Sequence, residues 1–439
     1  MTQQNLSEKL FKPRVRQVET STLVSYSSET TPLIKAHSVL SGSHHVGWYR
    51  MINRLIWIWR GIDALEIEEV LSRIAVSDAP RSNETQLDTV IGNRRGNWCF
   101  EWSQQAMRWQ QKALEFEQGP DAGNAWLRAA NLYSIAAYPF IKGDELADQA
   151  ILLACKAYDN AAKFSEYRLK KIAFKVDDGK EVCGFLHIPS HGQGPYPTVM
   201  ICGMLDSLQI DFCRYFRDYL EPLGIAMLTL DMPSIGYSIK HKLTQETTTL
   251  HEQIVRQLED IAWIDHTRFG IVGMRFGANI ALRLAYMCPE KIKAVAVIGP
   301  IVHSLLHEEK YQQDIPRVVL DVFASRLGIY QVDGAALRHE LSCYSLKNQG
   351  LLGKRSKVPM LSVSLKDDIY SPKAESDLIR RSSMDADTII LPSQPVFANF
   401  EKALSETTNW LKAKNTLIIF NILLIFSHLL KKGSTQGDP

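Results

Sequence analysis

The 439-residue sequence is poor in the features that mark several large classes of protein. Its seven cysteines are odd in number and include no Cys-x-x-Cys pair, which argues against a disulfide framework and against a zinc site. The twelve histidines are scattered, and we predict no metal and no other cofactor. Fifty basic and 48 acidic residues leave a net charge of +2, without the broad positive field typical of nucleic-acid binding. These absences favour a globular protein with reduced thiols.

The sequence also lacks a long apolar segment near its start. The first residues, MTQQNLSEKLFKPRVRQ, contain no apolar core of a secretory signal, which favours a cytoplasmic protein. Near the other end, residues 416–430 form an apolar run that falls short of the roughly 20 residues of a membrane span. Asn421 and His428 interrupt this run, and we predict no stable membrane span. We interpret residues 414–439 as a divergent tail, with a docking helix or an interfacial anchor as alternatives.

Three further segments are expected along the chain. Residues 1–45 are rich in Ser, Thr and charge and are predicted to be extended. Residues 46–165 have a helical pattern and contain most of the tryptophans. Trp98, Trp102 and Trp109 share one face of a predicted helix, and a second helix is expected over 146–164. Such a stripe could line a ligand pocket, but it is more often the core between a helical domain and its neighbour.

Residues 166–413 have the pattern of an α/β domain. Two strands are expected on either side of a turn at residues 177–179, where Asp-Gly favours a hairpin. Short apolar runs then alternate with helical segments over the rest of the domain. This alternation predicts a doubly wound, mostly parallel sheet. In such sheets the site lies at the carboxyl ends of the strands, so these ends hold the candidate functional residues.

The most informative motif is GMRFG at residues 273–277, between an apolar run and a helix-forming stretch. It has the outline of the G-x-S-x-G nucleophile elbow of α/β-hydrolases, with arginine in place of serine. A guanidinium stays protonated and cannot act as a nucleophile. Because a helix N-terminus favours anions, we interpret Arg275, with Phe276 beside it, as an anion- or substrate-binding site. The alternative is that Arg275 pairs with a buried carboxylate, Asp367 or Asp231.

Serine-hydrolase chemistry also needs an acid and a base. Asp367 and Asp368 end a predicted strand where α/β-hydrolases place the acid, although paired carboxylates are also common on solvated loops. The segment after the last strand, where the base is expected, contains no histidine. Of the other histidines, His303 follows a strand end and is a better candidate than His241, although both have the pattern of structural or surface residues.

Three serines are considered as a replacement nucleophile: Ser207, Ser234 and Ser238. Ser207 follows the third strand, where the neighbouring Gly203 and Met204 occupy the usual position of an oxyanion hole. Ser234 and Ser238 lie in a loop whose pattern favours a tight turn. The residues alone therefore assign no catalytic triad.

Longer stretches carry a family resemblance over residues 1 to about 413. They include GWYRMINRLIWIWRGID, AAYPFIKGDELADQA, GIAMLTLDMPSIGYS, VGMRFGANIALRLAY and YSLKNQGLLGKR. The chain resembles the fermentation–respiration switch protein family, the FrsA esterases. This resemblance implies an α/β-hydrolase fold, a cytoplasmic carboxylesterase, and the glucose-specific IIA component of the sugar phosphotransferase system as a partner.

Two functions are compatible with these observations. The first is a hydrolase of small carboxylic esters whose nucleophile elbow has changed. The second is a catalytically degenerate hydrolase that regulates metabolism by binding an anionic metabolite and the IIA component. The missing Ser–His pair favours the second, whereas the family resemblance favours the first.

Overall fold

The computed structural model describes residues 37–116, 119–176, 180–329 and 334–433, with side chains up to residue 414. Residues 1–36 of the predicted extended segment lie outside this range. The segment can be followed from β1 (His37–Ser38), which pairs antiparallel with β2 (Gly42–Ser43).

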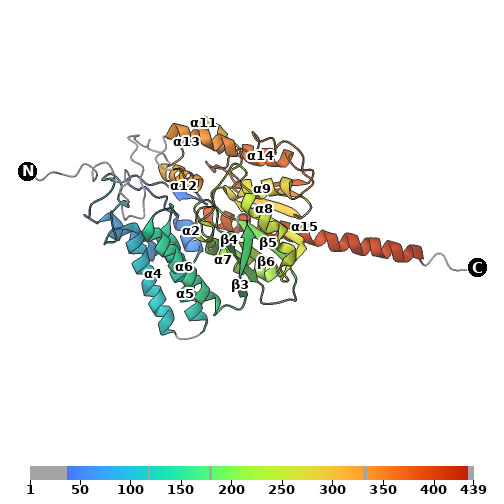
Figure 1. Ribbon diagram of the computed structural model, residues 1–439, viewed down its shortest axis with the longest axis horizontal. Helices are drawn as coiled ribbons and strands as arrows, with labels where there is room; N and C mark the ends of the chain where they lie inside the picture. The colour runs from blue at the N-terminus through green and yellow to red at the C-terminus, as the bar shows by residue number, and fades with distance from the viewer. Residues whose placement is uncertain (1–36, 117–118, 177–179, 330–333, 434–439) are drawn as a thin grey trace, which may run out of the picture.

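A helical region precedes the large sheet, and its longest helices pack side by side (Figure 1). Its members are α2 (Arg54–Trp59), α3 (Ala64–Ala75), α4 (Trp98–Glu115), α5 (Pro120–Ala137) and α6 (Glu145–Ala162). Asp63, Asn97 and Asp144 begin α3, α4 and α6 by accepting hydrogen bonds from backbone amides of the first turn. The second predicted helix, over 146–164, is confirmed as α6.

The expected helical pattern is interrupted between α3 and α4. Residues 76–97 form turns because Pro80, Gly92 and Gly96 disfavour helix there. A fully buried ion pair fixes this segment, with Arg50 Nη1 3.1 Å from Asp88 Oδ2.

The tryptophan stripe is core, as the sequence favoured. Trp98 and Trp102 on α4 are fully buried, and Trp57 of α2 packs against both, with ring centroids 6.3 and 5.4 Å away. Trp109 is only partly buried. The core continues from these rings into the sheet as one cluster.

The sheet has eight strands in the order β10-β9-β8-β7-β5-β6-β4-β3. Neighbours from β10 to β6 are parallel, whereas β4 and β3 add antiparallel at one edge. The strands are β3 (Arg168–Val176), β4 (Lys180–Ile188), β5 (Tyr196–Cys202), β6 (Ala226–Thr229), β7 (Ile264–Met274), β8 (Ala294–Ile298), β9 (Met360–Leu365) and β10 (Ala386–Leu391). The mostly parallel sheet is therefore confirmed, and the hairpin turn at 177–179 lies outside the described residues.

Helices flank the sheet and complete the α/β architecture (Figure 1). They are α7 (Cys213–Tyr215) with the following turn η3 (Phe216–Leu220), α8 (Thr249–Arg256), α9 (Gly277–Met287), α10 (Ser304–His307), α11 (Glu309–Gln312), α12 (Arg317–Leu327), α13 (Gly334–Leu341), α14 (Lys373–Arg381) and α15 (Val396–Gly433). The start of α15 packs on β7, β8 and β9, and its far end extends beyond the body in Figure 1.

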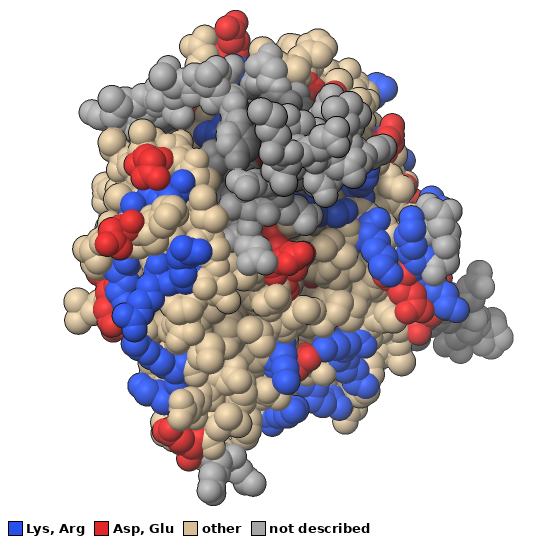
Figure 2. All heavy atoms as spheres, turned by 60° about the vertical axis from the view of Figure 1, so that its left-hand side comes forward, with Lys and Arg blue, Asp and Glu red and all other residues tan. Residues whose placement is uncertain are grey.

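The surface carries basic and acidic side chains in several separate groups on the face shown in Figure 2. Within the described residues, every helix falls short of the length and hydropathy that a membrane crossing needs.

Candidate active site

The strand order reverses direction at β5, which lies between β6 and β7. Cys202 and Gly273 are partners in the parallel ladder, so the carboxyl ends of β5 and β7 are level. Open α/β sheets bind ligands in the crevice outside such a switch point. The residues that follow these two strands, 203–206 and 275–276, therefore form the candidate site.

The GMRFG motif has the backbone of a nucleophile elbow. Arg275 lies between β7 and α9 with φ = 53°, a left-handed conformation that non-glycine residues rarely adopt. A Cβ atom at Gly277 would lie 2.0 Å from the carbonyl oxygen of Cys202. The glycine therefore lets the start of α9 approach the end of β5. The elbow geometry is retained although the serine is not.

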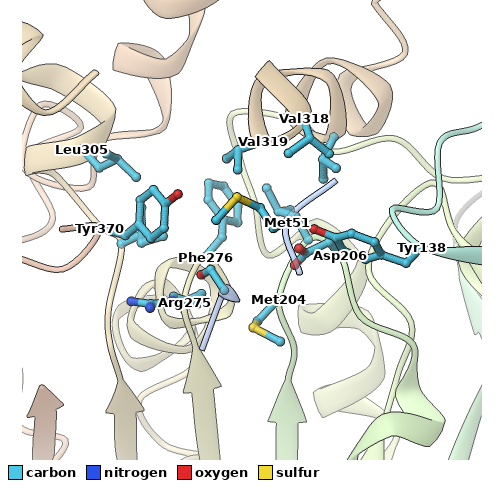
Figure 3. A pocket seen from close by; sticks show the side chains of 14 residues that line it. Met51, Tyr138, Met204, Asp206, Arg275, Phe276, Leu305, Val318, Val319 and Tyr370 are labelled. Carbon is cyan, nitrogen blue, oxygen red and sulfur yellow. The ribbon is translucent and has the colours of Figure 1, made fainter. Parts of the chain in front are cut away.

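The Arg275 side chain is buried and has several partners. Its Nη1 atom donates to Asp368 Oδ2 at 2.7 Å and to the carbonyl of Gly299 at 3.4 Å. Its Nη2 atom donates to Ser38 Oγ in β1. The guanidinium lies 5.6 Å from the ring centre of Tyr370 and beneath that ring in Figure 3. Arg275 thus connects the elbow, the end of β9 and the N-terminal hairpin.

The partner of Arg275 differs from the two carboxylates considered from the sequence. Asp367 is exposed, and its side chain is bonded by Ser393 Oγ at 3.4 Å. The Asp231 carboxylate accepts hydrogen bonds from Gln209 and from the backbone amide of Tyr237. Asp368 is the paired residue because its carboxylate turns inward after β9. Arginine and aspartate meet directly where a serine hydrolase would interpose a histidine.

His303 and Ser207 are not brought together as a catalytic pair. His303 Nδ1 lies 2.8 Å from Ser345 Oγ, and the His303 amide donates to the Glu375 carboxylate. Ser207 is buried, and its Oγ donates to the carbonyl of Met204 at 3.2 Å. Neither His303, Ser345 nor Ser207 is among the residues that line the pocket at the elbow.

A cavity of about 60 Å³ opens at the switch point. Its walls are mostly apolar, and Arg275 and Asp206 contribute charges from opposite sides (Figure 3). The lining residues are Ser41, Met51, Tyr138, Met204, Leu205, Asp206, Arg275, Phe276, Ile301, Leu305, Val318, Val319, Val322 and Tyr370. The cavity is closed by residues from the helical region, the N-terminal segment and α12.

Asp206 is a candidate functional residue that sequence reasoning missed. It lies in the turn after β5, and its side chain makes no hydrogen bond or ion pair with another described residue. Burial raises the pKa of this carboxyl, while Arg326, Arg275 and Arg60 act in the opposite direction. A carboxyl group that stays available and has a raised pKa in a cleft is typical of acid–base chemistry. A lone carboxylate directly after a buried parallel strand was the signal that could have identified it.

Two backbone amides near the cavity are also available. The amides of Phe276 and Met204 make no hydrogen bond to another described residue. Both residues line the cavity, and they follow the two strands of the switch point. Paired amides at these two positions hold the carbonyl oxygen of an ester substrate in α/β-hydrolases. Gly203 directly precedes Met204, and a Cβ atom at Gly203 would be 2.8 Å from Ser207 Oγ.

All seven cysteines are free thiols. Within the described ranges, no group of three His, Cys, Asp or Glu side chains has the arrangement of a metal site.

Comparisons with known proteins agree with this geometry. The family model "Esterase FrsA-like" matches residues 1–416. The chain is 58% identical to the esterase FrsA of Photorhabdus laumondii and 52% identical to that of Yersinia pestis, each over 94% of this chain and 100% of the relative. Among solved structures, it is similar to 2,6-dihydroxy-pseudo-oxynicotine hydrolase, with a TM-score of 0.64 and 18% identity over 82% of this chain and 94% of that one. It is also similar to AbyA5, with a TM-score of 0.61 and 18% identity over 74% and 90% of the two chains.

The similar solved structures show the α/β-hydrolase fold, and the sequence matches, which span more of the chain, identify the family. An elbow at the switch point, a helical region before the sheet and a match over residues 1–416 lead to the same assignment. The chain belongs to the FrsA-like esterase family and is an esterase-type hydrolase by descent.

Proposed function

We propose that the protein hydrolyses small carboxylic esters with a water molecule that Asp206 activates. The observation that carries this proposal is the available Asp206 carboxyl group in the elbow cavity, opposite Arg275. No serine lies at the elbow, and His303, the candidate base from the sequence, is engaged by Ser345 instead. A carboxylate base that acts on water needs neither.

The cavity residues account for each step of this reaction. The ionised Asp206 takes a proton from water, and the oxygen of that water attacks the ester carbonyl. The amides of Phe276 and Met204 receive the resulting oxyanion, which is the role of an oxyanion hole. As the tetrahedral intermediate collapses, the C–O bond to the alcohol breaks, and protonated Asp206 returns its proton to the departing alkoxide.

The cavity also limits the substrate. Its volume of about 60 Å³ accommodates about four water-sized groups. Apolar side chains such as Met51, Leu305 and Val318 form most of its wall. We therefore propose short acyl groups, such as acetyl, as the substrate class.

The test is the hydrolysis of p-nitrophenyl acetate by the full chain and by Asp206→Asn. We expect the substitution to lower kcat/KM by about 100-fold or more, which is the usual contribution of a general base. The wild-type rate should rise with pH through a pKa above the usual aspartate range, and the variant should lose this dependence. Asp314→Asn, which changes an exposed aspartate, should retain wild-type activity.

A fluorophosphonate probe distinguishes this mechanism from a hidden serine nucleophile. We expect no stoichiometric labelling. A covalent adduct at Ser207, Ser345 or any other serine, or wild-type activity in Asp206→Asn, would overturn the proposal. The second outcome would favour the alternative of a catalytically degenerate regulator.

We also propose, from the family resemblance alone, that the protein binds the glucose-specific IIA component in the cytoplasm. The seven free cysteines support a reducing compartment. Titration calorimetry with the purified IIA component should give a heat of binding with one-to-one stoichiometry. The absence of any heat of binding would contradict this partner.

A further inference from the structure

A second cavity, separate from the elbow, lies where the helical region meets the segment after β5. It has a volume of about 320 Å³. Its walls come from the end of α2, from α4 and α5, and from α7 and η3. The lining residues are Trp59, Arg60, Gly61, Trp109, Phe116, Asp121, Asn124, Ala125, Leu127, Arg128, Arg214 and Arg217. We call this cavity the arginine groove.

The arginine groove is rich in positive charge. Arg60, Arg128, Arg214 and Arg217 line it, and Asp121 is the one carboxylate among the described lining residues. The carboxylates that pair with these arginines lie outside the lining, and they are Asp211, Glu66, Asp218 and Glu401.

Two arginines share one counterion. Asp218 accepts from Arg214 Nε at 2.9 Å and from Arg217 Nε at 2.8 Å. The side chains of Arg214 and Arg217 are 28% and 44% exposed, so both can be reached by a ligand. Both arginines line the groove whereas Asp218 does not, so an anion in the groove faces their guanidinium groups.

Arg60 supplies an independent sign that the groove accepts a ligand. Its Nη1 atom is 3.0 Å from Asp211 Oδ1, and its side chain is 9% exposed. Its Nε atom is buried and has no hydrogen-bond partner in the described part of the chain. A buried N–H without an acceptor is unfavourable because it has lost its hydrogen bonds to water. An oxygen atom of a ligand would satisfy this donor.

Aromatic rings form the other part of the wall. Trp59, Trp109 and Phe116 line the groove, and the Phe116 side chain is 47% exposed at the end of α4. The Arg128 guanidinium lies 4.1 Å from the centre of the Trp109 ring. The exposed ring of Phe116 beside these arginines suits a ligand that combines a planar group with negative charge.

We propose that the arginine groove binds a small organic phosphate with a planar ring, of the class of nucleoside monophosphates. Guanidinium groups bind phosphate oxygens through paired, charge-assisted hydrogen bonds. The ring of the ligand contacts the aromatic wall. This binding is separate from ester hydrolysis and does not depend on Asp206.

The groove is linked to the elbow cavity through Arg60. Arg60 also lines a small neighbouring cavity whose wall contains Asp206 and Met204. A phosphate bound in the groove would therefore be separated from the Asp206 carboxyl group by the Arg60 side chain.

Titration calorimetry on the full chain tests the proposal with three probes: adenosine monophosphate, adenosine and inorganic phosphate. We expect adenosine monophosphate to bind with one-to-one stoichiometry and at least about tenfold more tightly than either of the others. Equal affinity for inorganic phosphate, or no binding of adenosine monophosphate, would overturn the proposal.

Matched substitutions locate the site. Arg217→Gln should weaken adenosine monophosphate by about tenfold, whereas Arg268→Gln, which also changes a partly exposed arginine paired with an aspartate, should not. Phe116→Ser should weaken binding by about threefold, whereas Phe397→Ser, at another exposed phenylalanine, should have no effect. Melting temperatures within about 2 °C of the wild type confirm that these surface changes leave the fold intact. Equal losses in the groove variants and their controls would overturn the assignment.

Discussion

Arg275 combines two roles that serine hydrolases divide among several residues. Its backbone has the left-handed conformation of the elbow residue, and its side chain pairs directly with Asp368, which occupies the position of the acid, without an intervening histidine. Both side chains of the Arg275–Asp368 pair are at most 4% exposed. A buried charge that loses its partner is strongly destabilising, whereas a buried pair replaced as a whole is often tolerated. The residue is therefore structural as well as a source of positive charge.

The first prediction concerns this ion pair. Arg275→Ala should lower the free energy of unfolding by about 3–5 kcal/mol because Asp368 stays buried and unpaired. Arg275→Lys should recover only part of the loss because a point charge cannot replace the planar fork. Urea denaturation monitored by circular dichroism measures both.

The control for the first prediction is the double variant Arg275→Met/Asp368→Leu, which should regain much of the loss. A single variant with wild-type stability would show that the pair contributes little. Calorimetry with small carboxylates on the same proteins distinguishes a structural Arg275 from an anion receptor. We expect little change in carboxylate affinity because Nη1 and Nη2 are already engaged.

The second prediction concerns pH. Burial raises the pKa of Asp144, the N-cap of α6, to about 7. Below about pH 4, both the folded and unfolded states hold this proton. Between about pH 4 and 7 the unfolded state releases it first, so the folded state binds more protons and stability falls as pH rises, by up to about 4 kcal/mol. Above about pH 7 this contribution is constant.

Asp144→Asn should flatten that decline because the amide does not titrate and its oxygen still accepts from the Ala147 amide. Asp63→Asn, at the exposed N-cap of α3, is the matched control. Urea denaturation at several pH values between 4 and 8 measures the difference. An unchanged pH dependence in Asp144→Asn would show that this carboxyl group is ionised throughout.

At the scale of elements, the elbow depends on close approach between α9 and β5. The third prediction is that Gly277→Ala destabilises the protein by about 3 kcal/mol or more, because its methyl group would overlap the carbonyl of Cys202. Gly270→Ala, on the preceding strand β7, meets its nearest atoms at 3.4 Å and should cost less than about 1 kcal/mol. Thermal melts of both variants make the comparison, and equal melting temperatures would contradict it.

The strands were predictable from sequence because buried parallel strands are short apolar runs between turn residues. Every strand expected between residues 169 and 397 is present. The elbow was predictable because its two glycines stand on either side of a strand-to-helix junction. The interruption at residues 76–97 was missed because a long helical pattern on both sides concealed the turn residues within it.

The position of the candidate site at the strand ends was predictable, but the hydrogen-bond and ion-pair partners of its side chains were not. Asp367 and Asp368 are adjacent, and only the three-dimensional turn after β9 decides which one faces inward. Ser38 is bonded to a residue 237 positions away, a contact that no local pattern indicates. Asp206 lies between Met204 and Ser207, which were considered, and its position after a buried parallel strand was the one signal that the sequence offered for it.

At the scale of the whole molecule, the family match ends at residue 416, close to where the tail was set apart. The side chains of the predicted tail from residue 415 onward lie outside the described residues, although the backbone of α15 continues to Gly433. The last fully buried residue of α15 before that point is Leu411, and Thr408 Oγ1 lies 2.9 Å from Tyr215 Oη.

The fourth prediction is that removing residues 416–439 changes the melting temperature by less than about 2 °C and improves solubility, because exposed apolar runs promote association. A truncation after residue 406 is the control, and it should be strongly destabilised because it removes Leu411 and Thr408. Differential scanning calorimetry compares the two. A large fall in melting temperature for the shorter deletion would show that the tail packs against the body.

The contact between Ser38 and Arg275 also affects how the site is assembled during protein synthesis. Ser38 and Leu40 leave the ribosome early, yet they cover Arg275 and Gly299, which are made more than 200 residues later. Ser38 and Leu40 can therefore dock onto the elbow only after Arg275 and Gly299 have been synthesised and folded. A chain interrupted anywhere before the elbow has no place to seat this hairpin, and a chain that begins after Leu40 has an elbow whose arginine has lost one of its partners.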